Sequence, residues 1–343
     1  MIEIDGSFGE GGGQVLRTSL GLSCLLNKTF HIFNIRKKRK KPGLMPQHLM
    51  GIQALKLISH AKVQGDTIGS TELFFEPVEV KPGYYSFDIG TAGSTSLLLQ
   101  AILPPLIFTQ GKSTLSLKGG THVPWSPPFD YLKEVFFSML SRLGIKVKAG
   151  IESYGFYPKG GGKVNVEITQ ANRDTMKGIN LLERGAIKRL RGLSGVGNLP
   201  LSIAERQKEA ALTILVSQGI DAEIETISVP TPGQGTFIFL KVETDNCIAG
   251  FSSLGERGKK AELVGGEGAK HFLDYYSTFA CLDHHMADQI VLYLAIAKGE
   301  SSFTTSMITN HLLTNLWAIE KFLGTKYVVE GELGKPGRIK IMG

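Results

Sequence analysis

One order of elements, helix–strand–loop–helix–strand, recurs three times in this chain of 343 residues and constrains its fold more than any other feature. The strands are short β-like runs such as 29–35 and 302–306. The six helices of the three copies are expected at about residues 14–26, 46–59, 95–103, 129–143, 285–297 and 312–323. The copies match in order and not in residue identity. This order predicts an α/β (α+β) fold of repeated units that pack around a common centre and bring equivalent loops into one cleft.

The stretch between the second and third copies departs from this order. A glycine-rich segment at 155–162 leads into an expected strand at 163–168, and helices follow at about 202–217 and 268–282. The length suits two domains. We therefore predict a small α/β domain inserted at residues 184–277, and a main domain of repeated units built from residues 1–183 and 278–343.

Charge and cysteine usage narrow the class of protein. The net charge of +7 favours anionic partners, nucleic acid among them. Cys24, Cys247 and Cys281 are far apart and odd in number, which is typical of a reducing compartment. The chain shows no signal-peptide pattern, and no apolar run reaches the roughly 18 residues of a membrane span. A cytoplasmic protein without a membrane segment is expected.

Residues 309–315, Thr-Asn-His-Leu-Leu-Thr-Asn, hold the strongest single candidate for chemistry. Thr309 or Asn310 suits a helix N-cap, which places His311 in the first turn of the last repeated helix. The positive end of a helix disfavours a protonated imidazole and favours bound phosphate. His311 is thus a candidate nucleophile toward phosphorus, although a histidine in this position is by itself more often structural.

A second candidate lies in the glycine-rich turn 9–14, between the first strand and the first helix. Its backbone N–H groups are able to approach phosphate, but Glu10 would repel phosphate unless a divalent metal stood between them. Glu10 is therefore a candidate metal ligand, with an ordinary tight turn as the alternative. Arg17, one helical turn later, either extends to solvent or turns inward onto an anion. The turn is neither a Walker sequence nor a strict GxGxxG.

Other polar groups are weaker candidates. Six consecutive cations at 36–41 form either a solvated loop or a contact to a phosphate backbone, and the repeat favours the second because it directs them toward His311. Gln100, among leucines, is either a core amide or a ligand contact. The apolar loop 124–129 either walls a purine pocket or packs structurally. Asp288 is placed to orient an imidazole, whereas the two histidines before it make a weak zinc site.

Six motifs taken in order resemble the RNA 3'-terminal phosphate cyclase family over nearly the whole chain, and the match is weakest in the insert. The motifs are Gly9 to Arg17, Lys41 to Leu44, Gln47-His48, Ala92 to Ser94, Gly155 to Gly162 and His311 to Asn315. The resemblance implies repeated α/β units of the type shared with carboxyvinyl transferases, together with a small inserted domain. It also implies ATP-dependent conversion of RNA 3'-phosphate ends to 2',3'-cyclic phosphate, with AMP and pyrophosphate released.

The resemblance assigns roles to nine residues. His311 looks like the nucleophile that becomes adenylylated, and Glu10 looks like the ligand of a divalent metal, Mg²⁺ or Mn²⁺. The resemblance implies that phosphates or the RNA end are contacted by Arg17, Arg39 and Gln47. It implies that the ATP pocket is formed by Gln100, Pro128, His285 and Asp288. His285 departs from relatives that carry Tyr there. The choice between Arg36 and Arg39 stays open, as does assembly into a homo-oligomer.

Three rival functions come from related folds. Cyclase-like relatives in ribosome biogenesis lack the histidine, so His311 favours the active enzyme over such a non-catalytic protein. A carboxyvinyl transferase is disfavoured by the cationic loop and by the His-Leu-Leu-Thr-Asn motif. A non-catalytic RNA-binding protein would bind RNA ends without consuming ATP.

Overall fold

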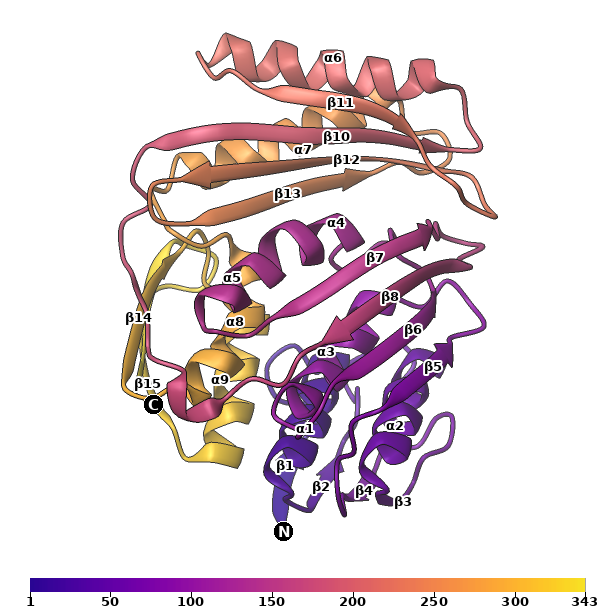
Figure 1. The fold of residues 1–343 in the computed structure, drawn as a ribbon, viewed down its shortest axis with the longest axis vertical. Helices are drawn as coiled ribbons and strands as arrows, with labels where there is room; N and C mark the ends of the chain where they lie inside the picture. The colour runs from indigo at the N-terminus through magenta and orange to yellow at the C-terminus, as the bar shows by residue number, and fades with distance from the viewer. Residues whose placement is uncertain (343) are drawn as a thin grey trace.

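A computed structural model describes residues 1–342 and contains three units with one shared order, β-α-β-α-β-β (Figure 1). The first consists of β1 (Ile2–Asp5), α1 (Gly13–Leu26), β2 (Phe30–Phe33), α2 (Pro46–Ser59), β3 (Lys62–Gln64) and β4 (Leu73–Glu76). The second consists of β5 (Tyr84–Asp88), α3 (Thr95–Ile107), β6 (Ser113–Gly119), the continuous helical stretch α4 (Phe129–Tyr131), η1 (Leu132–Phe136) and α5 (Phe137–Arg142), β7 (Val147–Ser153) and β8 (Gly162–Ile168). The third consists of β9 (Asn180–Leu181), α8 (His284–Ile296), β14 (Glu300–Thr305), α9 (Asn310–Leu323), β15 (Lys326–Gly331) and β16 (Gly337–Met342).

The three units also share their sheet topology. The strands lie in the orders β1-β2-β4-β3, β5-β6-β8-β7 and β9-β14-β16-β15, so each sheet runs first, second, fourth, third. The first two strands of each unit are parallel, which requires the helical crossover between them, and the other pairs are antiparallel. The predicted α/β fold of repeated units is confirmed.

The inserted segment forms a fourth sheet of its own. It contains β10 (Ile187–Gly197), α6 (Leu201–Ser217), β11 (Glu223–Ser228), β12 (Gly235–Thr244), β13 (Ile248–Leu254) and α7 (Ala261–Tyr276), with strand order β11-β10-β12-β13. Its helices cover one face of the sheet, while β13 lies over the helical stretch α4–α5 of the second unit (Figure 1). A buried apolar cluster inside it is distinct from the larger core of the three units. In the chain, the insert stands between the first strand and the first helix of the third unit.

Several local predictions were wrong. The strand at 163–168 does not interrupt the repeat, because it is the final strand of the second unit and pairs antiparallel with β6. Helix α3 does not stop at Leu103 but passes through Pro104 and Pro105 to Ile107, since these residues are buried and packing outweighs the lost backbone hydrogen bonds. Helix α7 begins seven residues before the expected 268 and ends at Tyr276. No helix within residues 1–342 is long and apolar enough to cross a membrane.

Candidate active site

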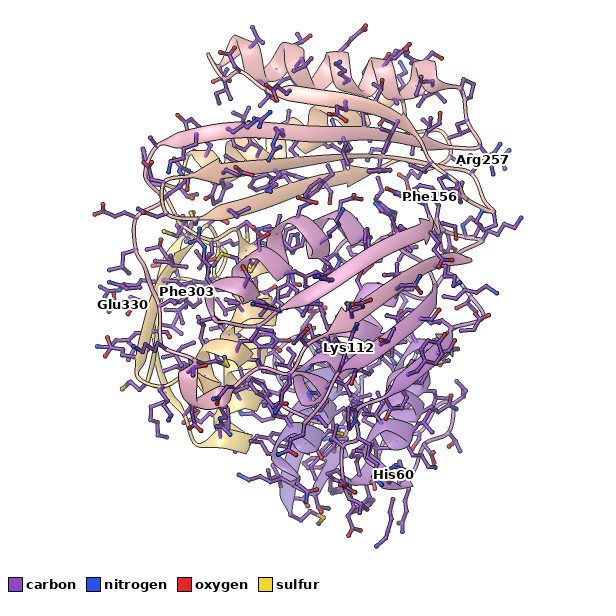
Figure 2. The ribbon with its side chains drawn as sticks, in the orientation of Figure 1. His60, Lys112, Phe156, Arg257, Phe303 and Glu330 are labelled. Atoms are coloured by element: carbon purple, nitrogen blue, oxygen red, sulfur yellow. The ribbon has the colours of Figure 1, made fainter. Side chains whose placement is uncertain are left out.

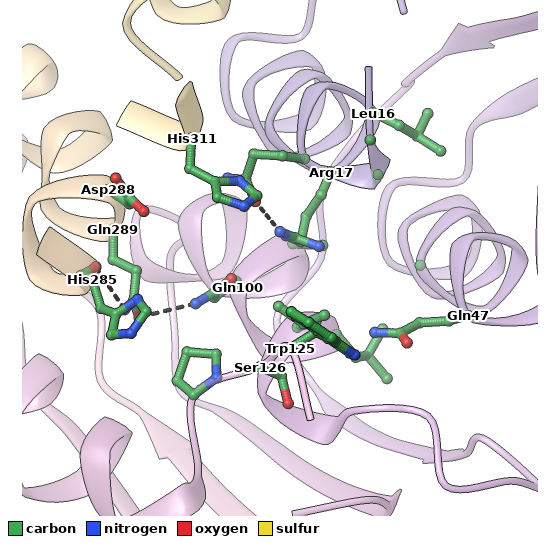
Figure 3. Close-up of a pocket in the computed structure, with 18 of the residues that line it drawn as sticks. Leu16, Arg17, Gln47, Gln100, Trp125, Ser126, His285, Asp288, Gln289 and His311 are labelled. Carbon is green, nitrogen blue, oxygen red and sulfur yellow. Dashed lines mark hydrogen bonds between the residues drawn. The ribbon is translucent and has the colours of Figure 1, made fainter. Parts of the chain in front are cut away.

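Residues from all three units line a cavity of about 570 Å³, to which the insert also contributes. Figure 3 shows residues of its wall, with His311 and Arg17 on one side and His285, Gln289 and Gln100 grouped on another. The cavity is lined by all nine residues to which sequence analysis assigned a role: Glu10, Arg17, Arg39, Gln47, Gln100, Pro128, His285, Asp288 and His311.

His311 stands in the first turn of α9, as its sequence neighbours predicted. Thr309 is the N-cap, because its Oγ1 accepts a hydrogen bond of 3.0 Å from the Leu312 N–H, and the same hydroxyl donates to Asp288 Oδ1 at 2.6 Å. The Nε2 atom of His311 lies 2.8 Å from Glu10 Oε2, although the side chain is still 47% exposed. Helix geometry and one carboxylate therefore fix the imidazole at the cavity surface.

The surrounding protein favours the neutral form of the His311 imidazole. Partial burial lowers the pKa of His311; Glu10 opposes the shift, and the guanidinium groups of Arg17 and Arg39 add to it. The net direction is downward, so the fraction of unprotonated ring at neutral pH rises. An unprotonated imidazole is the form that attacks an electrophile.

Two arginines provide positive charge beside this histidine. Arg39 pairs with Glu10, and Arg17 donates to Gln14 Oε1. The Nε–H of Arg17 is buried without a hydrogen-bond partner, and burial lowers the pKa of Arg17 to about 10, so the group stays charged at neutral pH. A buried guanidinium with an unused donor is suited to an anion, because an unpaired buried donor is costly.

Of the two arginines left open by the sequence, Arg39 lines the cavity and Arg36 does not. Arg36 instead donates to the Gly43 carbonyl at 3.0 Å and adopts a left-handed φ of 55°. Its side chain therefore closes the cationic loop on itself, which leaves Arg39 facing the site.

The glycine-rich turn needs glycine for reasons of space. A Cβ on Gly13 would lie 2.4 Å from His48 Nε2, and one on Gly12 would lie 3.0 Å from the Arg39 guanidinium. Gly12 is the N-cap of α1, and this helix start has no side-chain cap. The absence of side chains lets His48 and Arg39 pack against the start of α1, where N–H groups are available to phosphate.

The cavity wall also carries amides and an unusual carboxyl. Gln100 Nε2 donates to Gln289 Oε1 at 2.9 Å, and Gln289 Nε2 donates to the His285 carbonyl at 2.9 Å. Burial raises the pKa of Asp288 to about 8, and the nearby Asp283 and Glu10 add to the shift. The His285 ring opens onto the cavity, yet the depth of protein around it and the neighbouring His284 lower the pKa of His285 well below its ordinary value. Neutral flat groups and amides suit a nucleobase better than they suit phosphate.

A buried polar network joins the first and third units beneath the cavity. Asn315 Oδ1 accepts from Gln14 Nε2 at 2.8 Å and from Thr18 Oγ1 at 2.7 Å, while Asn315 Nδ2 donates to the Asp288 carbonyl at 2.6 Å. Gln14 and Asn315 stand within the sequence motifs, but no pattern there indicates this role. The insert also contributes Gly250 and Ser252 to the wall, which no local pattern indicates.

Glu10 is the carboxylate best placed for a divalent metal. Within residues 1–342 no cluster of three or more His, Cys, Asp or Glu side chains is arranged to hold a metal. Mg²⁺ typically binds one or two carboxylates and completes its coordination with substrate phosphates and water. One carboxylate in a cavity that also holds two arginines fits that pattern, so the donor set suits a metal that arrives with a nucleotide.

Comparison with known proteins gives one consistent result. A family model described as RNA 3'-terminal phosphate cyclase matches residues 8–329. Three proteins named RNA 3'-terminal phosphate cyclase serve as examples. That of Staphylothermus marinus is 44% identical (100% of this chain, 98% of its own), that of Thermococcus kodakarensis 45% (99% and 98%), and that of Archaeoglobus fulgidus 45% (96% and 98%). The repeated fold, the cavity and these matches lead to one conclusion: the chain belongs to the RNA 3'-terminal phosphate cyclase family.

Proposed function

We propose that the protein converts RNA 3'-terminal phosphate to 2',3'-cyclic phosphate at the expense of ATP, through a covalent histidine–AMP intermediate. The observation that carries this proposal is the position of His311. Its imidazole is held neutral at a helix N-terminus, facing a cavity that also holds Glu10 and the partly unpaired Arg17. A nucleophile, an anion-binding helix end and an unused cationic donor are the groups that nucleotidyl transfer requires.

In the first step, His311 Nε2 attacks the α-phosphorus of ATP. The N–P bond forms as the bond from the α-phosphorus to the bridging oxygen breaks, and pyrophosphate leaves with the electron pair. Arg17 and Arg39 are placed to offset the negative charge that develops on the leaving group. A divalent metal held by Glu10 would supply further neutralisation of the phosphates when bound.

The close approach of Glu10 to His311 sets a condition for this step. Glu10 Oε2 lies 2.8 Å from Nε2 and so occupies the space in front of this nitrogen. Attack needs a free lone pair on Nε2, which requires the tautomer with the proton on Nδ1. Glu10 therefore gives up this contact when ATP phosphates enter the cavity.

Two further transfers complete the reaction. An oxygen of the RNA 3'-phosphate attacks the phosphorus of the histidine-bound AMP, the N–P bond breaks and the imidazole is regenerated. The 2'-hydroxyl of the terminal ribose then loses its proton and attacks the activated 3'-phosphorus, and AMP leaves. Gln47 and Arg39, which both line the cavity, are the groups we assign to the RNA phosphate.

A radiolabel experiment tests the covalent step. Incubation with α-labelled ATP and Mg²⁺ or Mn²⁺ is expected to give an AMP–protein adduct that is labile in acid and stable in base, as a phosphoramidate is. His311→Asn removes the adduct. The matched control is His60→Asn: His60 is exposed at the end of α2, away from the cavity (Figure 2), and its left-handed φ of 50° is one that Asn accepts.

Cyclisation of a 3'-phosphate RNA is measured alongside. An adduct that persists in His311→Asn would refute the nucleophile assignment. A wild-type protein that binds RNA ends but forms neither adduct nor cyclic phosphate would refute catalysis and favour a non-catalytic binder.

A further inference from the structure

We propose that Trp125 is a stacking platform for the base of the 3'-terminal RNA nucleotide. The inference rests on the proposed function, because it assumes that RNA 3' ends enter the cavity. It adds a contact to the nucleobase, whereas the groups described so far address phosphate and ATP.

Trp125 is fully exposed to solvent and is also part of the cavity wall, which is unusual for a tryptophan that contacts no ligand. Its surface is 98% exposed, the highest value among the large hydrophobic residues of the described chain, and it also lines the catalytic cavity. An indole ring in water forgoes the large stabilisation that its burial would bring. Trp125 contributes little to the core and offers its full face to whatever enters the cavity.

The backbone holds this ring in an unfavourable conformation. The φ of Trp125 is +66°, in the left-handed region that bulky residues rarely adopt. Strain of this kind persists only where the surroundings enforce it, and it is concentrated at ligand-binding positions. Pro124 and Pro127 restrict the chain on either side, and Ser126 Oγ donates to the Val123 carbonyl at 3.1 Å.

A buried polar cluster anchors the loop that carries Trp125. His122, 1% exposed, lies 2.8 Å from Asp130 Oδ2 through Nε2 and 3.0 Å from Thr121 Oγ1 through Nδ1. Thr121 Oγ1 in turn accepts from the Gly155 N–H at 2.9 Å. Both ends of the loop are thereby fixed to the second unit. A loop backbone that is fixed in advance loses little entropy when a ligand binds to it.

The place of Trp125 in the cavity selects the ligand. Figure 3 shows the ring beside Gln47 and apart from His285 and Asp288. We assigned Gln47 to the RNA end and the His285 side to ATP, so the base that reaches Trp125 belongs to RNA. Every base has a π-face, so stacking here would hold the terminal nucleotide without reading its sequence.

An abasic substrate tests this assignment. Two RNAs of equal length are compared, both with a 3'-phosphate, one with a normal terminal nucleotide and one with an abasic terminal ribose. Stacking contributions to single-stranded binding correspond to a preference of roughly 5- to 150-fold. The wild type is expected to prefer the complete RNA by such a factor in kcat/KM, Trp125→Ala to lose most of the preference, and Trp125→Phe to keep most of it.

A matched control and two contrary outcomes make the test decisive. Phe279 is likewise an exposed aromatic residue, at 77%, with a left-handed φ of 57°, but it does not line the catalytic cavity, so Phe279→Ala should keep the wild-type preference. A preference that survives in Trp125→Ala would overturn the proposal. A higher ATP concentration required for adduct formation by Trp125→Ala would also overturn it, because that result would place the adenine ring on Trp125 instead. Failure of the proposed function is distinguishable, because it would remove adduct and cyclic product from the wild type itself.

Discussion

The carboxyl group of Asp288 should make the protein less stable as the pH rises, and replacement by Asn should remove that loss. Its pKa rises from the ordinary 3.8 to about 8 because the group is buried near Asp283 and Glu10. In the unfolded chain Asp288 ionises near pH 4, while in the folded chain it stays protonated until about pH 8. Folding then requires proton uptake between these values, so stability is greatest below pH 4 and falls up to pH 8.

The magnitude follows from the size of the shift. One pKa unit corresponds to about 1.4 kcal/mol, so the full shift would cost the wild type about 6 kcal/mol at pH 9 relative to pH 3. Water at the cavity surface screens part of this, and we expect a change of about 2 kcal/mol between pH 5 and pH 9 in the difference between Asp288→Asn and wild type. Asn at this position is still able to accept the hydrogen bond from Thr309 Oγ1.

Urea unfolding at pH 5, 7 and 9 measures this difference. The free energy of unfolding of Asp288→Asn should increase relative to that of the wild type as the pH rises. Asp174→Asn is the control, because the Lys298 ammonium lowers the pKa of Asp174 and the carboxylate is ionised in both states across this range. A difference for Asp288→Asn that does not change with pH, or that changes in favour of the wild type, would refute the reasoning.

Two further predictions concern the turn that faces His311. Glu10→Gln removes the one neighbour that raises the pKa of His311, so the imidazole should titrate at lower pH than in the wild type in an NMR pH titration, and an unchanged or higher value would contradict this. Gly13→Ala places a methyl group 2.4 Å from His48 Nε2, and urea unfolding should show a loss of about 1–3 kcal/mol from overpacking. Gly51→Ala, a helical position with no atom within 4 Å of the added carbon, is the control and should gain up to about 1 kcal/mol; equal losses in both variants would rule out the clash.

Local sequence was sufficient for the positions of most helices. Helix α2 lies at the expected 46–59, and Thr309 caps α9 so that His311 falls in its first turn. Caps, apolar runs and glycine turns act over a few residues, so they can be identified from the sequence alone. The recurrence of these elements was also legible, and from it came the expectation that distant loops share one cleft.

The pairing of strands into sheets was much harder to predict from the sequence. Strands β4 and β16 were not predicted. Strand β8 was predicted, but as part of a segment that breaks the repeat. A short strand acquires its identity from the neighbour that completes its hydrogen bonds, and that neighbour lies elsewhere in the chain. The same holds for α3, where burial of Pro104 and Pro105 overrides the helix-ending tendency of proline.

For the site, the sequence determined which side chains are chemically able to serve, and the tertiary structure decided which of them meet. His311 and Glu10 were candidates from their local settings, but only the packing of the first unit against the third brings their side chains to 2.8 Å. Whether Arg36 or Arg39 faces the cavity, and whether Trp125 packs inward or stands in solvent, likewise depended on the assembled fold. Local interactions set the conformation of short segments, whereas the burial of a shared core sets the contacts between segments far apart in the chain.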